Sequence, residues 1–140
     1  MSDSVLTPHS ALVYLMVIVA AADSKMVDAE IGAMSHTVSH LPVFEGYDRA
    51  KLLSAVQACN DIIEHGEGLE TVLGLVSEAL PDSLRDTAYA IACTVAISDG
   101  RLGQEELRLL EMIRHELDID RLAAAAIERG IVALNRKLPA

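Results

Sequence analysis

Two long apolar segments constrain the fold of this chain more than any other feature. Residues 11–22 carry no charge, and residues 87–98 are likewise rich in Ala, Val and Ile. A helix that is apolar on all sides has to be buried on all sides, so both segments are predicted to be central helices. Twelve residues are too few to cross a bilayer, which takes about 20. The residues before the first segment carry Asp3 and no Lys or Arg, which is unlike a signal peptide.

Helical spacing of apolar residues continues along nearly the whole chain, and no stretch alternates long enough to predict a strand. Thr7 and Pro8 are a typical cap and first-turn pair for a helix to about Ala22, and another helix is expected from Asp82 to about Ser98. Five more helices are predicted from these stripes: Ile31, Met34, Val38 and Leu41, ending before Pro42; Leu52, Val56, Cys59 and Ile63, with Asp48 as the cap; Leu69, Val72, Leu73 and Val76; Leu107, Leu110, Ile113 and Leu117; Leu122, Ala126, Ile127, Ile131 and Leu134. The predicted fold class is therefore all-α, a compact bundle of about seven helices.

The size and composition of the chain favour one globular domain spanning residues 1–140. The chain has 140 residues, of which 51% are hydrophobic and 23% charged, so it can bury a core without disulfides. Cys59 and Cys93 fall in helical patterns without metal-ligand spacing, and they are predicted to be buried free thiols. Only four aromatic residues occur, which argues against a protein that stacks nucleic-acid bases.

The charge of the chain restricts its partners. It carries 21 acidic and 11 basic residues, for a net charge of −10. Such a chain repels phosphate backbones and anionic lipid surfaces, so no nucleic acid and no inserted membrane are expected as partners. Cations and basic protein surfaces suit it better. It also has no cluster of Lys and Arg able to hold an oxyanion directly.

An internal repeat organises the predicted helices. A shift of 76 residues lays residues 11–38 over residues 87–114, and Val19, Ala20, Asp23 and Glu30 then match Val95, Ala96, Asp99 and Glu106. Each copy reads as an apolar helix, a turn opened by an Asp, and an amphipathic helix that begins near a Glu. We therefore predict two helical hairpins, around residues 8–41 and 82–117, packed about a pseudo-two-fold axis.

The repeated Asp and Glu leave two interpretations open. The spacing is similar to the second half of an EF-hand loop, but the earlier ligand positions hold Val19, Ala21, Val95 and Ile97, which excludes an EF-hand. One interpretation is that the Glu residues interact with helix dipoles and cap helix ends. The other is that the pseudo-symmetry gathers four carboxylates, which bind a hard divalent cation such as Ca²⁺, Mg²⁺ or Mn²⁺.

The duplicated motif, with its Asp, a Gly or Ser, a hydrophobic residue and a Glu after an Ala- and Val-rich helix, resembles the tellurite-resistance TerB family. The resemblance covers roughly residues 8–135 and implies a bacterial, cytoplasmic protein of the tellurite or stress response. It also implies a divalent-cation site and partners associated with the membrane. Carried over by position, the candidate metal ligands are Asp23, Glu30, Asp99 and Glu106. The chain departs from the family at Ser24, Val27 and Gly103.

Other candidate chemistry is weaker. His36 and His40 lie four residues apart on one predicted helix and are either metal ligands or solvated residues near its end. No phosphate-binding loop, nucleophile elbow or Cys–His pair is readable, so no enzymatic activity is predicted. The two functional hypotheses are a non-enzymatic cation-binding protein and a helical interaction module with an anionic docking face.

Overall fold

A computed structural model describes residues 6–21, 28–65, 68–97 and 103–139, with the side chains of residues 28–30 left out. These residues form helices and no strand, which confirms the all-α prediction. The α-helices are α1 (Pro8–Ala20), α2 (Asp28–His40), α3 (Leu52–Glu64), α4 (Gly68–Ala79), α5 (Arg85–Ala96), α6 (Gln104–Glu116) and α7 (Arg121–Leu134). Three short 3-10 helices, η1 (Pro42–Phe44), η2 (Arg49–Lys51) and η3 (Asp82–Leu84), precede or follow them.

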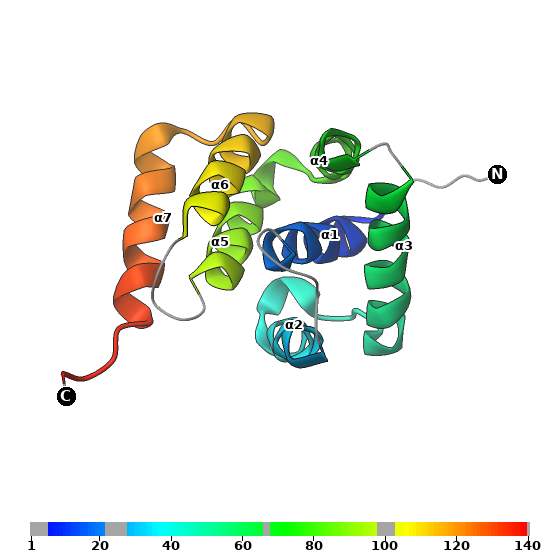
Figure 1. Cartoon of the computed structure of the whole chain (residues 1–140), viewed down its shortest axis with the longest axis horizontal. Coiled ribbons are helices and arrows are strands. Elements are labelled where there is room, and N and C mark those ends of the chain that lie inside the picture. The colour runs from blue at the N-terminus through cyan, green and yellow to red at the C-terminus, as the bar shows by residue number, and fades with distance from the viewer. Residues whose placement is uncertain (1–5, 22–27, 66–67, 98–102, 140) are drawn as a thin grey trace.

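The centre of the fold is α1, and of the described α-helices only α7 lies away from it, on the far side of α5 (Figure 1). Every residue of α1 from Ala11 to Ala20 is buried, and the helix contacts α2, α3, α4, α5 and α6. Its first turn is capped as predicted, because Oγ1 of Thr7 accepts a hydrogen bond from the backbone N–H of Ser10 at 3.1 Å. The other apolar helix, α5, is buried between α1 on one side and α6 and α7 on the other. Burial on all sides is therefore confirmed for α1, whereas α5 is buried over most of its surface and leaves Thr94 exposed.

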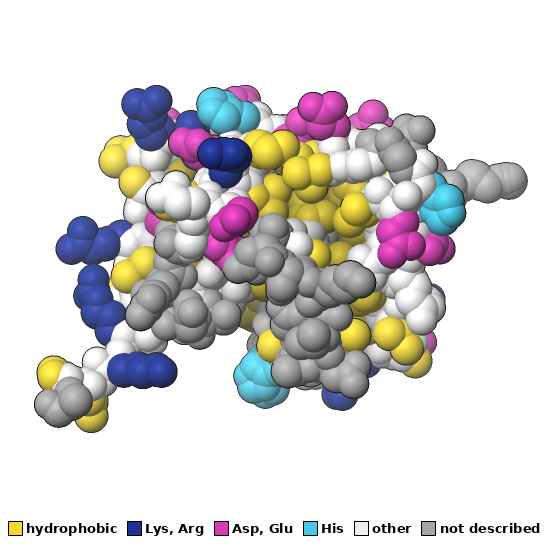
Figure 2. All heavy atoms as spheres, viewed as in Figure 1, with side chains coloured by type: hydrophobic (Ala, Val, Ile, Leu, Met, Phe, Trp, Pro, Cys, Tyr) yellow, Lys and Arg dark blue, Asp and Glu magenta, His cyan; other side chains and the backbone are white. Residues whose placement is uncertain are grey.

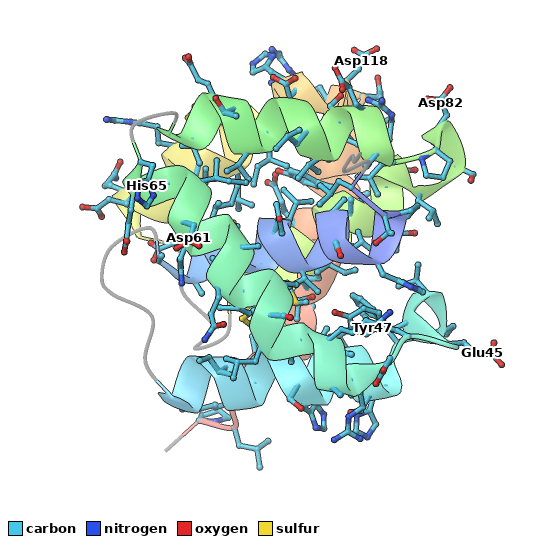
Figure 3. The ribbon with its side chains drawn as sticks, turned by 90° about the vertical axis from the view of Figure 1, so that its right-hand side faces the viewer. Glu45, Tyr47, Asp61, His65, Asp82 and Asp118 are labelled. Atoms are coloured by element: carbon cyan, nitrogen blue, oxygen red, sulfur yellow. The ribbon has the colours of Figure 1, made fainter. Side chains whose placement is uncertain are left out.

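Aspartates lie at several helix starts and turns. Asp48 accepts a hydrogen bond from the N–H of Ala50 at 3.0 Å, so it caps the 3-10 turn that leads into α3. Asp120 caps α7 by accepting from Leu122 and Ala123. Between α6 and α7, Asp118 takes a left-handed conformation with φ of 54°, which an Asp tolerates better than most residues (Figure 3). This turn reverses the chain within a few residues.

Three of the predicted apolar stripes are wrong in part. Leu41, the last residue of the stripe before Pro42, is 37% exposed. Leu107 is 40% exposed, and α6 buries Leu109 instead, two residues further along. In α7, Leu122 and Leu134 are 77% and 85% exposed, and only Ala124 is fully buried. The reason is that α7 packs mainly against α5, so a small residue lies in the contact and the flanking leucines face solvent.

One arginine joins the ends of three helices. The Arg85 guanidinium donates to the carbonyl of Leu117 at 3.0 Å and to that of Ser77 at 3.1 Å. Both carbonyls belong to helix C-termini, where they have no partner in the helix. The Nε of Arg85 also lies 3.2 Å from Asp82 in η3. Arg85 thus holds the start of α5 to the ends of α4 and α6.

The helix bounds agree with the 76-residue shift. The shift carries the bounds of α2 onto those of α6, and it carries the last residue of α1 onto the last residue of α5. Equal bounds alone do not establish a repeated three-dimensional arrangement. The pseudo-two-fold axis and the two-hairpin division stay predictions.

Candidate cation site and the adjacent hollow

The four candidate metal ligands are described to different extents. Asp23 and Asp99 lie outside the described residues. Glu30 lies in the first turn of α2, where the backbone is described and the side chain is not. The fourth candidate, Glu106, is described fully and lies in the first turn of α6. The arrangement of the four carboxylates therefore stays a prediction.

The Glu106 side chain folds back over the start of its own helix. Gly103 is the N-cap of α6, and a Cβ at this position would collide with Oε1 of Glu106. The third residue of a helix has such a position in a capping box, where its carboxylate reaches back toward the N-cap. Gly103 has no side chain with which to form the other half. A carboxylate has about four lone-pair sites, so a capping position is compatible with binding a cation as well.

A hollow of about 430 Å³ is lined by the end of α1 and the start of α6, together with residues of α3 and α4. One wall contains Ala21, which follows α1 and precedes Asp23 by two residues. Another contains Gln104, the first residue of α6, five residues after Asp99. The end of α1 and the start of α6 therefore face the same space.

The hollow is apolar inside and polar at one edge. Hydrophobic side chains line its floor between α6 and α4 (Figure 2). The polar lining residues, Gln104, Glu105 and Arg108, all come from the first two turns of α6. A volume of this size is in the range of small-molecule sites. Sequence patterns did not reveal the hollow, because its lining comes from four helices that are distant in the chain. The apolar residues that line it are Ile18, Ala21, Ile63, Leu69, Leu109 and Met112.

The thiols are unsuited to chemistry at a site. Cys59 and Cys93 are fully buried and free, as predicted. Burial raises the pKa of each thiol to about 12, so neither is a thiolate at neutral pH. Within the described ranges, no three or more His, Cys, Asp or Glu side chains come together in a way that would hold a metal ion.

Four of the five histidines fall into three groups, and the fifth, His115, lies beside Arg114 on α6. His9 is packed on Phe44 and Tyr47, with Nε2 at 2.8 Å from the carbonyl of Val43. His36 and His40 are brought together, with ring centroids 4.0 Å apart at an interplanar angle of 27°. Among the described side chains, His65 is not stacked on another ring. The His36 and His40 pair is thus the one predicted pair of candidate ligands that the structure brings together.

The helices, the core and the charge define an acidic, all-α helical bundle. None of the helices in the described ranges combines the length and hydrophobicity that a membrane span needs. The sequence matches the family described as "Tellurite resistance protein TerB" over residues 9–129, which is most of the chain. The protein belongs to the TerB family. Comparison with curated proteins and with solved structures gave no match.

Proposed function

We propose that this protein is a non-enzymatic, cytoplasmic protein of the tellurite-resistance and stress-response type that binds a divalent cation. The proposed ligands are the carboxylates of Asp23, Glu30, Asp99 and Glu106. The proposed ion is a hard one, such as Ca²⁺, Mg²⁺ or Mn²⁺, because carboxylate oxygens favour such ions. Membership of the TerB family supports the general role.

The observation that carries the proposal is the shared hollow. Ala21 and Gln104 line the same space, and each lies a few residues from one of the two acidic turns. Ala21, just before the first predicted turn, and Gln104, just after the second, are therefore neighbours across one hollow. A cation that bridges the turns would also offset part of the net charge of −10, which otherwise disfavours the compact state.

The test is the thermal stability of the full chain with and without metal. Starting from protein treated with chelator, we expect saturating Ca²⁺, Mg²⁺ or Mn²⁺ to raise the melting temperature, because the ion binds only the folded state. At a hundred times the Kd the gain is about 2.7 kcal/mol, or roughly 6–10 °C for a domain of this size. The double variant Asp99→Asn with Glu106→Gln is expected to lose this increase.

Glu105→Gln is the matched control. Glu105 lies in the same helical turn as Glu106, is exposed, and carries the same charge. The metal-dependent increase is expected to survive this substitution, because Glu105 does not belong to the proposed ligand set. If Glu105→Gln removes the increase as fully as the double variant does, the ion responds to general negative charge and not to these ligands.

The second candidate function is a helical interaction module whose acidic residues only cap helices. It is favoured by the position of Glu106 over Gly103. It predicts that the melting curve is unchanged by all three ions. It also predicts that Glu106→Gln lowers stability by about 0.3–1 kcal/mol without metal, because the first turn loses a favourable charge. An unchanged melting curve rejects the cation site.

We also propose that the protein acts with a protein partner at the membrane and does not bind tellurite itself. Tellurite is an oxyanion, and this acidic chain carries no cluster of basic residues to attract it. Protection would then be indirect, through metal handling or partner binding. Tellurite that bound the purified protein as tightly as a divalent cation would contradict this part of the proposal.

A further inference from the structure

The last turns of α2 carry two imidazole rings that face each other. The ring centroids of His36 and His40 are 4.0 Å apart, and both side chains are exposed to solvent. Residues four apart on a helix lie one above the other, so the shared position follows from the backbone. Nothing in the proposed cation site uses these residues, which lie at the other end of α2 from Glu30.

A hydrogen bond fixes the proton on one of these rings. Nδ1 of His40 lies 2.7 Å from the carbonyl oxygen of His36. A carbonyl only accepts, so Nδ1 carries the proton and donates. In the neutral ring the lone pair is then on Nε2. Histidines that bind metals usually donate their other ring N–H to such an acceptor, which orients the ring and increases its basicity.

We propose that His36 and His40 form a second, independent metal site that chelates a transition-metal ion through one nitrogen of each ring. The ion class is Ni²⁺, Cu²⁺ or Zn²⁺, because imidazole suits these ions and binds Ca²⁺ and Mg²⁺ poorly. The protein supplies two ligands and solvent supplies the others. Such a site exchanges its ion readily, in contrast to a structural zinc site with four protein ligands.

The probe is Ni²⁺ added to the full chain and followed by calorimetry at pH 7.5, with imidazole proton and nitrogen NMR signals as a second readout. We expect an ion to bind that shifts the signals of both His36 and His40, besides any Ni²⁺ taken up by the carboxylate site. His36→Gln or His40→Gln is expected to weaken binding at least ~10-fold, because the second ligand of a linked pair adds a large effective concentration. Both residues are on the surface, and circular dichroism checks that each variant keeps its fold.

His65→Gln is the matched control. His65 is also exposed and near a helix end, and its Nδ1 lies 2.8 Å from the carbonyl of Asp61, four residues earlier (Figure 3). It therefore shares the fixed proton of His40 without a second imidazole stacked on it. Its loss is expected to change the affinity less than about twofold.

A relocated pair tests the geometry itself. Gly32 is exposed, and a Cβ there meets no other atom within 4 Å. The double variant Gly32→His with His40→Gln again places two imidazoles four residues apart, now at positions 32 and 36. We expect it to regain most of the affinity that His40→Gln loses. If it does not, or if His36→Gln and His40→Gln bind Ni²⁺ as tightly as the wild type, the chelate does not exist.

The two metal proposals can be tested independently of each other. The double variant Asp99→Asn with Glu106→Gln is expected to leave the Ni²⁺-dependent shifts of the His36 and His40 signals unchanged. His36→Gln is expected to leave the Ca²⁺, Mg²⁺ or Mn²⁺ effect on the melting temperature unchanged. Loss of Ni²⁺ binding in the carboxylate variant would overturn the independence of the two sites.

Discussion

The hydroxyl of Tyr89 on α5 donates a hydrogen bond of 2.5 Å to Oε2 of Glu128 on α7. Tyr89 is only 1% exposed, so the bond lies inside the contact between the two helices. Burial and this bond raise the pKa of the Tyr89 hydroxyl above its ordinary value. Because α7 fully buries only Ala124, a charged hydrogen bond contributes an unusual share of its attachment to the bundle.

Removing that hydroxyl should weaken the attachment of α7. Tyr89→Phe is expected to lower the free energy of unfolding by about 1.5–3 kcal/mol, because a partly buried carboxylate loses its donor. Tyr14→Phe is the control, since Tyr14 is also buried and no hydrogen bond of its hydroxyl is seen among the described residues. Urea unfolding of both variants measures the difference. Equal losses would mean that the Tyr89 bond adds nothing beyond the packing of the ring.

The arginine that joins α4, α5 and α6 is expected to matter more than its ion pair. Arg85→Ala should cost about 2 kcal/mol, because the carbonyls of Ser77 and Leu117 lose a charged donor. Asp82→Asn should change the free energy of unfolding by less than about 0.5 kcal/mol, since the Asp82 side chain is 99% exposed. Chemical denaturation of the two variants tests both values. A larger effect for Asp82→Asn would assign the stabilisation to the ion pair instead.

The buried thiols predict a loss of stability in alkali. In the unfolded chain Cys59 and Cys93 lose their protons near pH 9, whereas in the folded chain burial raises the pKa of each to about 12. Between these values the unfolded state binds fewer protons, so stability falls as pH rises, by up to about 1.4 kcal/mol per pH unit for each thiol. Urea unfolding at pH 8, 9.5 and 10.5 measures the slope. The double variant Cys59→Ala with Cys93→Ala should show a shallower slope, and an unchanged slope would contradict the assignment.

Two leucines that are both expected on apolar stripes should contribute very differently to the stability of the fold. Leu110 is 2% exposed in the core, and Leu110→Ala is expected to cost about 2–5 kcal/mol because it leaves a cavity. Leu122 is 77% exposed at the start of α7, and Leu122→Ala should change stability by no more than about 0.5 kcal/mol. Thermal or urea unfolding of the two variants measures both changes in stability. A large cost for Leu122→Ala would show that its side chain packs against another part of the chain.

The sequence predicts helices well here because local signals agree. Thr7 and Pro8 open α1 and Pro42 follows the end of α2, and each is a backbone constraint that does not depend on the tertiary fold. The helix faces were harder to predict. Leu122 and Leu134 are as hydrophobic as core residues, and only the position of α5 decides that Ala124 faces inward. Residue type does not contain that information.

For the candidate cation site, the sequence names candidate ligands but not their arrangement in space. The 76-residue shift identifies Asp23, Glu30, Asp99 and Glu106 from spacing alone. The hollow between α1, α3, α4 and α6 depends on how four separate helices meet, and no local pattern encodes it. For His36 and His40, helical spacing in the sequence predicts that the two rings lie together. The structure adds the hydrogen bond to the backbone carbonyl, which selects the tautomer of His40.

The all-round burial of α1 has a consequence for how its rotation is set. From Ala11 to Ala20 no charged side chain marks one face as outward, and the Tyr14 hydroxyl is the one polar group, so polarity does little to distinguish one rotation of the helix from another. Steric fit has to make that choice, because side chains as different in size as Ala11, Leu15 and Met16 are all fully buried. Deleting a single residue within α1 would turn the following side chains by about 100° and exchange large for small at every contact. The segment would still be fully apolar, yet its shape would no longer match the helices around it.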